Sequence, residues 1–228
     1  MASTLMTVAI LADGSSVKGQ IIAAGMDGYI IHDTTSSTVM KIPKLTGTYN
    51  PLDGSLKPDH DNNMYTNDLS REKEAYQRLQ GILVVANCLD TNTHGLVFEF
   101  YKNGDLEDYI RDNPPAPWSQ KVNWIFQILD AFIACHKRRI LVFDIALRNL
   151  MLDDDMNIKL IDFANCSLLP LDENTELVDE DGYTAEIDLL HVINVIYSIS
   201  RWDKFQTDCL KMDQWPAADS LPSTLGLP

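Results

Sequence analysis

The sequence predicts an α+β protein in which a β-rich first part is followed by a mainly helical second part. Strand patterns dominate roughly the first hundred of the 228 residues, and helix patterns dominate the rest, with one hairpin pattern among the helices. This order of elements favours two small lobes that share a cleft, with a hinge near residues 99–105.

The first strands are expected within residues 19–43, where three short segments are rich in apolar and β-branched residues. Gly, Asp, Ser or Pro bounds each of these segments, as is typical of turns between antiparallel strands. Residues 44–68 contain several Gly, Pro, Asp and Asn residues. They predict a long loop.

A helix is expected at residues 70–81, because apolar residues recur there at helical spacing. Ser70 is the expected N-cap, and Gly81 is the expected stop signal. Two further strands are predicted after this helix, at residues 82–89 and 95–101.

The second part begins with a turn and a short helix within residues 103–113, followed by a longer amphipathic helix over residues 118–138. The apolar stripe expected to face the core consists of Val122, Ile125, Phe126, Leu129, Phe132 and Ile133. A hairpin is expected at residues 149–163. Residues 186–200 are apolar nearly all round and predict a buried helix. Only about 28 residues follow it, so we expect incomplete burial. Either a partner covers the helix, or the chain is a truncated form, or the protein is only marginally stable.

The net charge of −15 disfavours nucleic acid and anionic membranes as partners, since both attract basic surfaces. No apolar run reaches the roughly 18 residues of a membrane helix, and the N-terminus lacks the basic region of a signal peptide. The four cysteines show no zinc-binding spacing. Reduced thiols in a cytoplasmic protein are therefore expected.

Two segments place polar groups between apolar runs. In "VFDIALRNLML", residues 142–152, Asp144 and Asn149 are five residues apart, and in "IKLIDFANC", residues 158–166, Asp162 follows a strand pattern. The expected hairpin returns Asn149 and Asp162 to the same end of a site.

These two segments resemble the catalytic loop H-R-D-L-x-x-x-N and the metal-binding motif D-F-G of the eukaryotic protein kinase family. The resemblance implies that Asn149 and Asp162 hold Mg²⁺ and that Asp144 accepts the proton of an incoming hydroxyl. Many members have a lysine where this chain has Ala146, and "DIALRN" is similar to the tyrosine-kinase form of the loop. Arg148 is therefore expected to supply the missing cation.

The upstream motifs occur in the family's order. Residues 23–30, "AAGMDGYI", resemble the glycine-rich loop, with Gly25 and Gly28 at two of its three glycines, although a plain hairpin turn is the commoner meaning of such a segment. "TVMK" resembles the V-A-I-K strand and makes Lys41 the phosphate-pairing lysine. Glu72 is then expected to pair with Lys41, with Glu74 as its rival.

The resemblance also implies an ATP pocket. Its expected lining consists of Ile30, Val39 and Met151 around the adenine, Phe98 behind it, and the hinge residues 99–101 with Glu99 and Tyr101. "YKNGDLEDYI" is similar to the family's post-hinge segment. The implied organisation is an N-terminal extension (1–18), an N-lobe (19–101) with an antiparallel sheet and one helix, and an incomplete, mainly helical C-lobe (102–228).

The chain departs from the family pattern at several positions. Val142 and Phe143 replace the histidine and arginine of H-R-D, so the arginine that usually binds an activation-loop phosphate is missing. We therefore expect no activation-loop phosphorylation switch. Ala164 replaces the glycine of D-F-G, and A-P-E is absent. The segment between Asp162 and Asp188 is short and acidic, so a peptide substrate should be basic.

Three functions are consistent with these motifs. The leading hypothesis is an ATP- and Mg²⁺-dependent protein kinase, because all of its polar core positions are present: Lys41, Glu72, Asp144, Asn149 and Asp162. The second is a nucleotide-binding pseudokinase or scaffold, which Ala164, the missing A-P-E and the short C-lobe favour. The third is a small-molecule phosphotransferase of the aminoglycoside-kinase type. The motifs leave serine/threonine or tyrosine specificity open.

Overall fold

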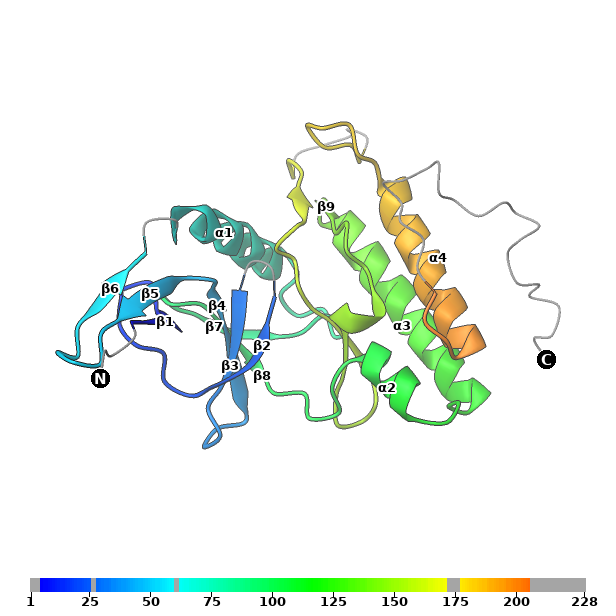
Figure 1. The fold of residues 1–228 in the computed structure, drawn as a ribbon. Coiled ribbons are helices and arrows are strands. Elements are labelled where there is room, and N and C mark those ends of the chain that lie inside the picture. The colour runs from blue at the N-terminus through cyan, green and yellow to red at the C-terminus, as the bar shows by residue number, and fades with distance from the viewer. Residues whose placement is uncertain (1–4, 26–27, 60–61, 172–176, 206–228) are drawn as a thin grey trace. The chain divides into compact units, whose positions relative to one another are not determined.

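The computed structural model describes residues 5–25, 28–59, 62–171 and 177–205, and for residues 63–68 the backbone alone. The chain divides into two compact units. The N-terminal unit comprises residues 1–81, 86–100 and 163–165, and the C-terminal unit comprises residues 82–85, 101–162 and 166–228. Strands predominate in the first unit and helices in the second (Figure 1), so the predicted α+β class is confirmed.

The N-terminal unit is built on a five-stranded antiparallel sheet with the order β2-β3-β4-β8-β7. Its strands are β2 Gln20–Ala24, β3 Gly28–His32, β4 Thr38–Pro43, β8 Leu96–Glu99 and β7 Cys88–Thr91. The three strands predicted within residues 19–43 are thus confirmed. The register of β3 and β4 places Ile30 opposite Lys41.

The strand predicted at residues 82–89 is wrong for most of its length, because β7 begins only at Cys88. Residues 82–85 instead belong to the C-terminal unit, where the Val84 carbonyl accepts a hydrogen bond of 2.9 Å from the Leu160 amide. Val85 is buried there. A short apolar run in the sequence predicts that the segment is buried, but it does not by itself distinguish a strand from a buried loop.

A second antiparallel sheet occupies the region predicted as a loop. It has the order β1-β5-β6, with strands β1 Met6–Ala9, β5 Thr46–Tyr49 and β6 Leu56–Pro58. The polar residues that indicated a loop bind the ends of these strands. Asn62 bonds both the amide and the carbonyl of Thr46, and Asp59 accepts from the Thr46 hydroxyl at 2.7 Å. The prediction of a structureless segment 44–68 was therefore wrong.

Helix α1, Asn63–Arg78, begins well before the predicted N-cap at Ser70, which lies inside the helix. Ser70 is exposed, while Glu72, Ala75 and Tyr76 form part of the buried face. Gly81 follows the helix with φ of +81°, a conformation that glycine adopts at no steric cost. The predicted stop signal is thus confirmed, and the predicted start is not.

The C-terminal unit contains three α-helices and two small antiparallel sheets among its described residues. The helices are α2 Leu106–Asp112, α3 Trp118–Lys137 and α4 Ala185–Arg201, and η2 Leu147–Asn149 is a short 3₁₀ turn. The sheets pair β9 Ile140–Leu141 with β12 Ser167–Leu168, and β10 Leu150–Leu152 with β11 Ile158–Leu160. Helices α3 and α4 lie side by side (Figure 1).

Helix α3 buries a different face from the predicted stripe. Phe126 is 63% exposed and Ile133 is also exposed, whereas Trp124 and Ile128 are fully buried. The helix carries apolar residues on two sides, so periodicity alone did not identify the core face. Hydrogen bonds of polar groups determine which face of α3 is buried. Lys121, which is also buried, donates to the Ser200 carbonyl, and the Trp124 indole donates to the Met156 carbonyl at 2.7 Å.

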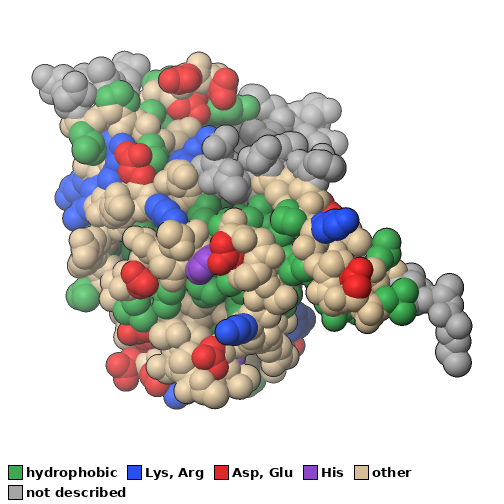
Figure 2. Space-filling view, turned by 90° about the vertical axis from the view of Figure 1, so that its left-hand side faces the viewer, with side chains coloured by type: hydrophobic (Ala, Val, Ile, Leu, Met, Phe, Trp, Pro, Cys, Tyr) green, Lys and Arg blue, Asp and Glu red, His purple; other side chains and the backbone are tan. Residues whose placement is uncertain are grey.

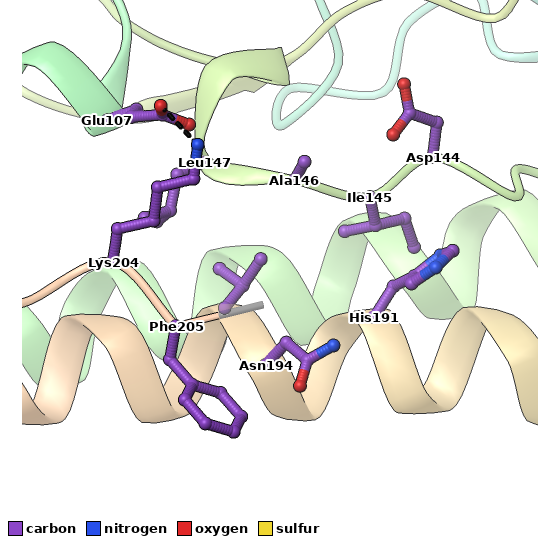
Figure 3. A pocket seen from close by; sticks show the side chains of 10 residues that line it. Glu107, Asp144, Ile145, Ala146, Leu147, His191, Asn194, Lys204 and Phe205 are labelled. Atoms are coloured by element: carbon purple, nitrogen blue, oxygen red, sulfur yellow. Dashed lines mark hydrogen bonds and ion pairs between the residues drawn. The ribbon is translucent and has the colours of Figure 1, made fainter. Parts of the chain in front are cut away.

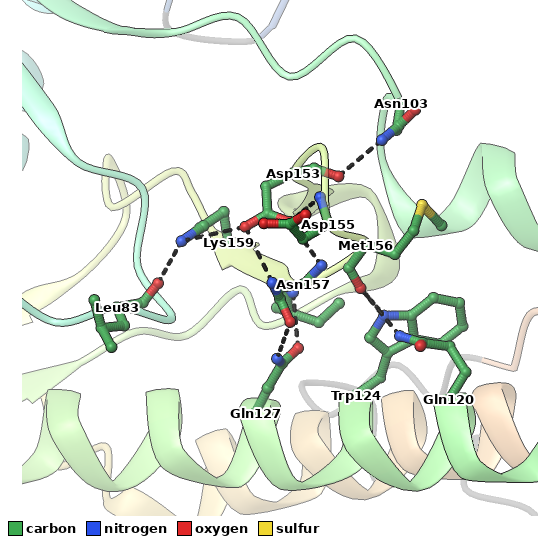
Figure 4. A network of polar contacts seen from close by, with 11 residues as sticks. Leu83, Asn103, Gln120, Trp124, Gln127, Asp153, Asp155, Met156, Asn157 and Lys159 are labelled. Carbon is green, nitrogen blue, oxygen red and sulfur yellow. Dashed lines mark hydrogen bonds and ion pairs between the residues drawn. The ribbon is translucent and has the colours of Figure 1, made fainter.

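A polar network fixes the β10–β11 hairpin to α3 (Figure 4). Gln127 accepts from the Ile158 amide and donates to Asn157, both at 2.8 Å. Asp153 accepts from the amides of Asp155 and Asn157 and so closes the turn. The network fixes the turn end of the hairpin, and its two strands lead from there back to Asn149 and Asp162.

Helix α4 is only partly buried. Val192, Val195 and Ile199 are in the core, but Leu189 and Ile193 are exposed. The prediction that this helix would lack complete cover therefore agrees with the described residues. On the face of the molecule that Figure 2 shows, acidic, basic and apolar side chains are interspersed. Among the described residues, no helix has the length and apolar character needed to span a membrane.

Candidate active site

The N-terminal unit contains a buried ion pair between a strand and a helix. Lys41 on β4 places its Nζ 2.9 Å from Oε1 and 2.7 Å from Oε2 of Glu72 on α1. The side chains are 13% and 1% exposed. Glu74 pairs instead with Arg78 one turn along the helix. Glu72 is therefore the partner of Lys41, as the motif order predicted.

Aromatic residues surround Glu72 on α1. The amide of Phe163 donates to Glu72 Oε1 at 3.3 Å. The Phe163 ring lies 5.0 Å from that of Tyr76, which also packs on Phe98 at 4.8 Å. Phe163 is fully buried. The residue that follows Asp162 is thus anchored in the core of the N-terminal unit.

The two predicted loop glycines differ in their steric surroundings. A Cβ on Gly28 would lie 2.8 Å from the Ile42 carbonyl oxygen, so this position requires glycine for the approach of β3 to β4. Gly25 donates to the Gly28 carbonyl at 2.9 Å, and a Cβ there would meet nothing closer than 3.7 Å. Packing therefore explains why position 28 requires glycine, but it gives no steric reason for glycine at position 25.

The remaining residues predicted to contact adenine lie in both units. Ile30 and Val39 are half-buried on β3 and β4 of the N-terminal unit, and Glu99 is the exposed end of β8. In the C-terminal unit, Tyr101 is buried and Met151 on β10 is half-buried, opposite Lys159. Their role in nucleotide binding stays a prediction.

In the C-terminal unit, the loop formed by residues 142–149 presents a carboxylate held by two neighbours. Arg148 Nη2 lies 2.5 and 2.7 Å from the two oxygens of Asp144. Asn149 Nδ2 donates to the Asp144 carbonyl at 2.9 Å and to its Oδ2 at 3.0 Å. Asp144 remains 28% exposed, so its carboxylate is oriented and still reachable from solvent.

Asp188 on α4 anchors the start of this loop. Its fully buried carboxylate accepts from the amides of Val142 and Phe143 at 2.8 and 2.7 Å, and it lies 2.8 Å from His136 Nε2. These contacts support Phe143 at φ of +61°, which is uncommon for a bulky residue. The sequence interpretation overlooked His136, although a histidine in the last turn of the helix before the loop was a visible signal.

Asn149 and Asp162, the predicted metal ligands, flank the β10–β11 hairpin. The Asn149 carbonyl accepts from the Ile161 amide at 2.9 Å, which ties the two ends together. Asp162 has φ of +67°, a strained conformation that is common at functional sites. Since Asn149 Nδ2 is committed to Asp144, its Oδ1 is the atom that remains for a cation.

The donor chemistry of this pair fits Mg²⁺. An amide oxygen and a carboxylate are hard ligands, and Mg²⁺ is commonly held by one or two protein groups together with phosphates and water. Within the described ranges, no cluster of three or more His, Cys, Asp or Glu side chains forms a metal site.

A small pocket lies beside Asp144 (Figure 3). The loop residues 144–147 line one side, and His191, Asn194 and Val195 of α4 line the other. Among the described residues, no group forms a hydrogen bond with the Nδ1 atom of His191, and burial lowers the pKa of this histidine. The sequence interpretation did not identify His191, because a single histidine in an apolar helix carries no distinctive pattern.

Three curated relatives illustrate what the chain resembles. A RasGEF domain-containing serine/threonine-protein kinase X from Dictyostelium discoideum is 27% identical over 123 residues, which cover 52% of this chain and 13% of that protein. The probable serine/threonine-protein kinase PBL18 of Arabidopsis thaliana is 26% identical over 110 residues, or 46% and 28% of the two chains. The serine/threonine-protein kinase SIK2 of Gallus gallus is 41% identical over 69 residues, or 30% and 9%.

The chain spans less than a third of the length of each of these relatives. The sequence model of the family described as "Protein kinase domain" matches residues 55–190, which is more than half of the chain. The match includes Glu72, the loop 142–149 and Asp162, and it ends just after Asp188. The predicted resemblance and the kinase-like fold are thereby confirmed, and the chain belongs to the protein kinase domain family.

Proposed function

We propose that this chain is an active protein kinase, which transfers the γ-phosphoryl group of ATP to a hydroxyl group of a protein substrate with the help of Mg²⁺. The observation that carries the proposal is the Asp144 carboxylate, which Arg148 and Asn149 orient and which solvent still reaches. A general base must be held in place and remain accessible to the proton that it accepts. Family membership supports this assignment.

The buried pair of Lys41 and Glu72 suits phosphate binding. A lysine held by a carboxylate is charged and pre-oriented, so it can pair with the ATP phosphates at little further entropic cost. Glu72 is the positioning residue in this pair. We propose that the same nucleotide also contacts Gly25, Gly28, Ile30, Val39, Glu99, Tyr101 and Met151.

Asn149 Oδ1 and the Asp162 carboxylate are the proposed Mg²⁺ ligands. The cation, when bound, supplies the charge neutralisation that phosphoryl transfer needs. The chain itself contributes orientation: Asn149 links the metal position to Asp144 through its amide nitrogen, and Arg148 adds a cation where Ala146 offers none. Asp144 then orients the substrate hydroxyl and accepts its proton.

The substrate is proposed to be a serine or threonine side chain in a basic segment. The names of the three relatives, all serine/threonine kinases, support serine/threonine specificity. The acidic segment before Asp188 supports a preference for basic substrates. We propose that a partner covers the exposed Leu189 and Ile193 of α4. A cytoplasmic location and the division into lobes 19–101 and 102–228 also remain proposals.

The test uses radiolabelled ATP, Mg²⁺ and a generic basic protein. Asp144→Asn keeps the shape of the side chain and removes the base, so phosphate incorporation should fall about 10²- to 10⁴-fold. Asp154→Asn is the matched control, because Asp154 lies in the β10–β11 turn, is exposed and pairs with the exposed Lys102. Equal incorporation by Asp144→Asn and the wild type would contradict the proposal.

A nucleotide-binding pseudokinase is the second candidate, and Ala164 in place of the motif glycine favours it. The structure weakens this argument, since Ala164 is not among the residues with positive φ and therefore adopts a backbone that alanine tolerates. The same experiment separates the candidates. Mg²⁺-dependent binding of ATP without phosphate incorporation by the wild type identifies the pseudokinase.

A further inference from the structure

Phe143 makes an aromatic contact with Tyr183 across the C-terminal unit. The two ring centroids are 5.6 Å apart, and the ring planes meet at 64° in an edge-to-face arrangement. Phe143 directly precedes Asp144, and Tyr183 lies in the segment that leads into α4. The contact therefore joins the loop that carries the proposed base to a segment about 40 residues further along the chain.

The Phe143 side of this contact is held rigidly. Buried Asp188 accepts from the Phe143 amide at 2.7 Å and from the Val142 amide at 2.8 Å. With the backbone fixed at φ of +61°, the direction of the Phe143 side chain is determined by the loop itself. A displacement of this ring consequently acts on the backbone next to Asp144.

The Tyr183 side is held by a hairpin that closes around Asp179. Asp179 Oδ1 accepts from the amides of Tyr183 and Asp181 at 2.8 and 3.0 Å, and its amide donates to the Tyr183 carbonyl at 2.9 Å. Asp179 Oδ2 accepts from the Ser167 hydroxyl at 3.0 Å. Since β12 containing Ser167 pairs with β9, the hairpin is connected back to the strand before the loop.

The charge of this segment disfavours a phosphate as its ordering group. Residues 166–185 contain no Lys or Arg, but they contain six carboxylates: Asp172, Glu173, Glu176, Asp179, Glu180 and Asp181. A phosphate added to a hydroxyl in the segment would meet like charges close by in the sequence. The aromatic contact orders the hairpin without any added charge.

We propose that Tyr183 is a positioning residue, and that its ring contact with Phe143 keeps the hairpin 177–185 and the loop 142–149 in their working arrangement without phosphorylation. The proposal rests on the proposed kinase function for its kinetic consequence. Its structural part, the order of the hairpin, does not depend on that function and is measured separately.

The structural test compares Tyr183→Ala with Tyr183→Phe, which keeps the ring and removes the hydroxyl. Glutamyl endopeptidase cleaves after Glu180 within the hairpin, and the cleavage rate is followed by mass spectrometry. Tyr183→Ala should raise this rate about threefold to tenfold, and Tyr183→Phe should leave it unchanged. Phe143→Leu, which keeps an apolar side chain without a ring, should reproduce the effect of Tyr183→Ala.

The kinetic test measures kcat and KM of the same variants after phosphatase treatment. We expect a lower kcat for Tyr183→Ala with an unchanged KM for ATP, wild-type values for Tyr183→Phe, and no effect of the phosphatase. Unaltered cleavage in both Tyr183→Ala and Phe143→Leu overturns the proposal, as does a phosphatase-sensitive wild type. If the wild type is inactive but Tyr183→Ala loosens the hairpin, the kinase function fails and the ordering contact stands.

Discussion

Two ion pairs, Lys41 with Glu72 in the N-terminal unit and Asp144 with Arg148 in the C-terminal unit, lie in opposite environments. The first joins a strand to a helix in the N-terminal unit, with side chains that are 13% and 1% exposed. The second lies within one loop of the C-terminal unit, four residues apart, with the arginine side chain 45% and the aspartate 28% exposed. Both are short, bidentate contacts.

The difference shows that similar distances correspond to different energies. Removing one partner of a buried pair leaves an uncompensated charge in a poorly solvated place, which is strongly destabilising. An exposed pair is screened by water and contributes little to stability. The first pair therefore stabilises the fold, whereas the second orients the proposed general base, Asp144, with almost no effect on the stability of the fold.

The largest effect is expected for Glu72→Ala. Lys41, whose side chain is only 13% exposed, would lose the carboxylate that it pairs with. The free energy of unfolding should therefore fall by about 3 to 5 kcal/mol, as measured by urea denaturation. Glu74→Ala is the matched control on the same helix, because Glu74 is exposed and pairs with Arg78 one turn along the helix. Its effect should be at most about 0.5 kcal/mol. Equal losses in the two variants would remove the contrast between buried and exposed pairs.

A smaller effect on stability, with a clear effect on rate, is expected for Arg148→Gln. The free energy of unfolding should change by less than about 1 kcal/mol, since the pair is exposed. The kcat should fall on the order of 10²-fold, because the carboxylate of Asp144 loses a bidentate donor. Arg148→Lys should restore part of the rate. A stability loss as large as that of Glu72→Ala would show that the loop pair is structural.

The smallest effect concerns His191, which lines the pocket beside Asp144. Burial lowers the pKa of His191, so the folded protein resists protonation while the unfolded chain takes up a proton near pH 6.5. Stability should therefore be lost as the pH falls below 6.5. The urea midpoint of the wild type should decline more between pH 7 and pH 5 than that of His191→Gln. Parallel declines would place His191 in a solvated environment.

The sequence predicted particular elements well where local signals and burial agreed. The three strands within residues 19–43 have clear boundaries of Gly, Asp, Ser and Pro, and Lys41 and Glu72 lie at the positions that the motif order requires. The same reasoning failed for residues 44–68. Their Asp and Asn side chains bind strand ends, as Asn62 and Asp59 do at Thr46, and such contacts over 13 or more positions leave no local pattern.

Helix α3 illustrates a second kind of failure. Its position was predicted almost to the residue, but Phe126 is exposed and Trp124 is buried, against the expected stripe. Hydrophobicity alone favoured the wrong face, because the core here also accepts hydrogen bonds from Trp124, Lys121 and Gln120. Which polar groups find partners depends on the neighbouring hairpin and on α4, and neither is visible in the helix sequence.

The sequence by itself determined the kind of protein and the identity of its reactive side chains, because spacing within a strand, a turn or a loop is a local property. Asp144, Arg148 and Asn149 are neighbours in the chain, so their proximity was determined by the backbone of one loop. Only the tertiary structure decided that Asp188 and His136 anchor that loop and that Phe143 contacts Tyr183. These contacts join residues 40 to 52 positions apart, and their energies depend on burial that the whole fold creates.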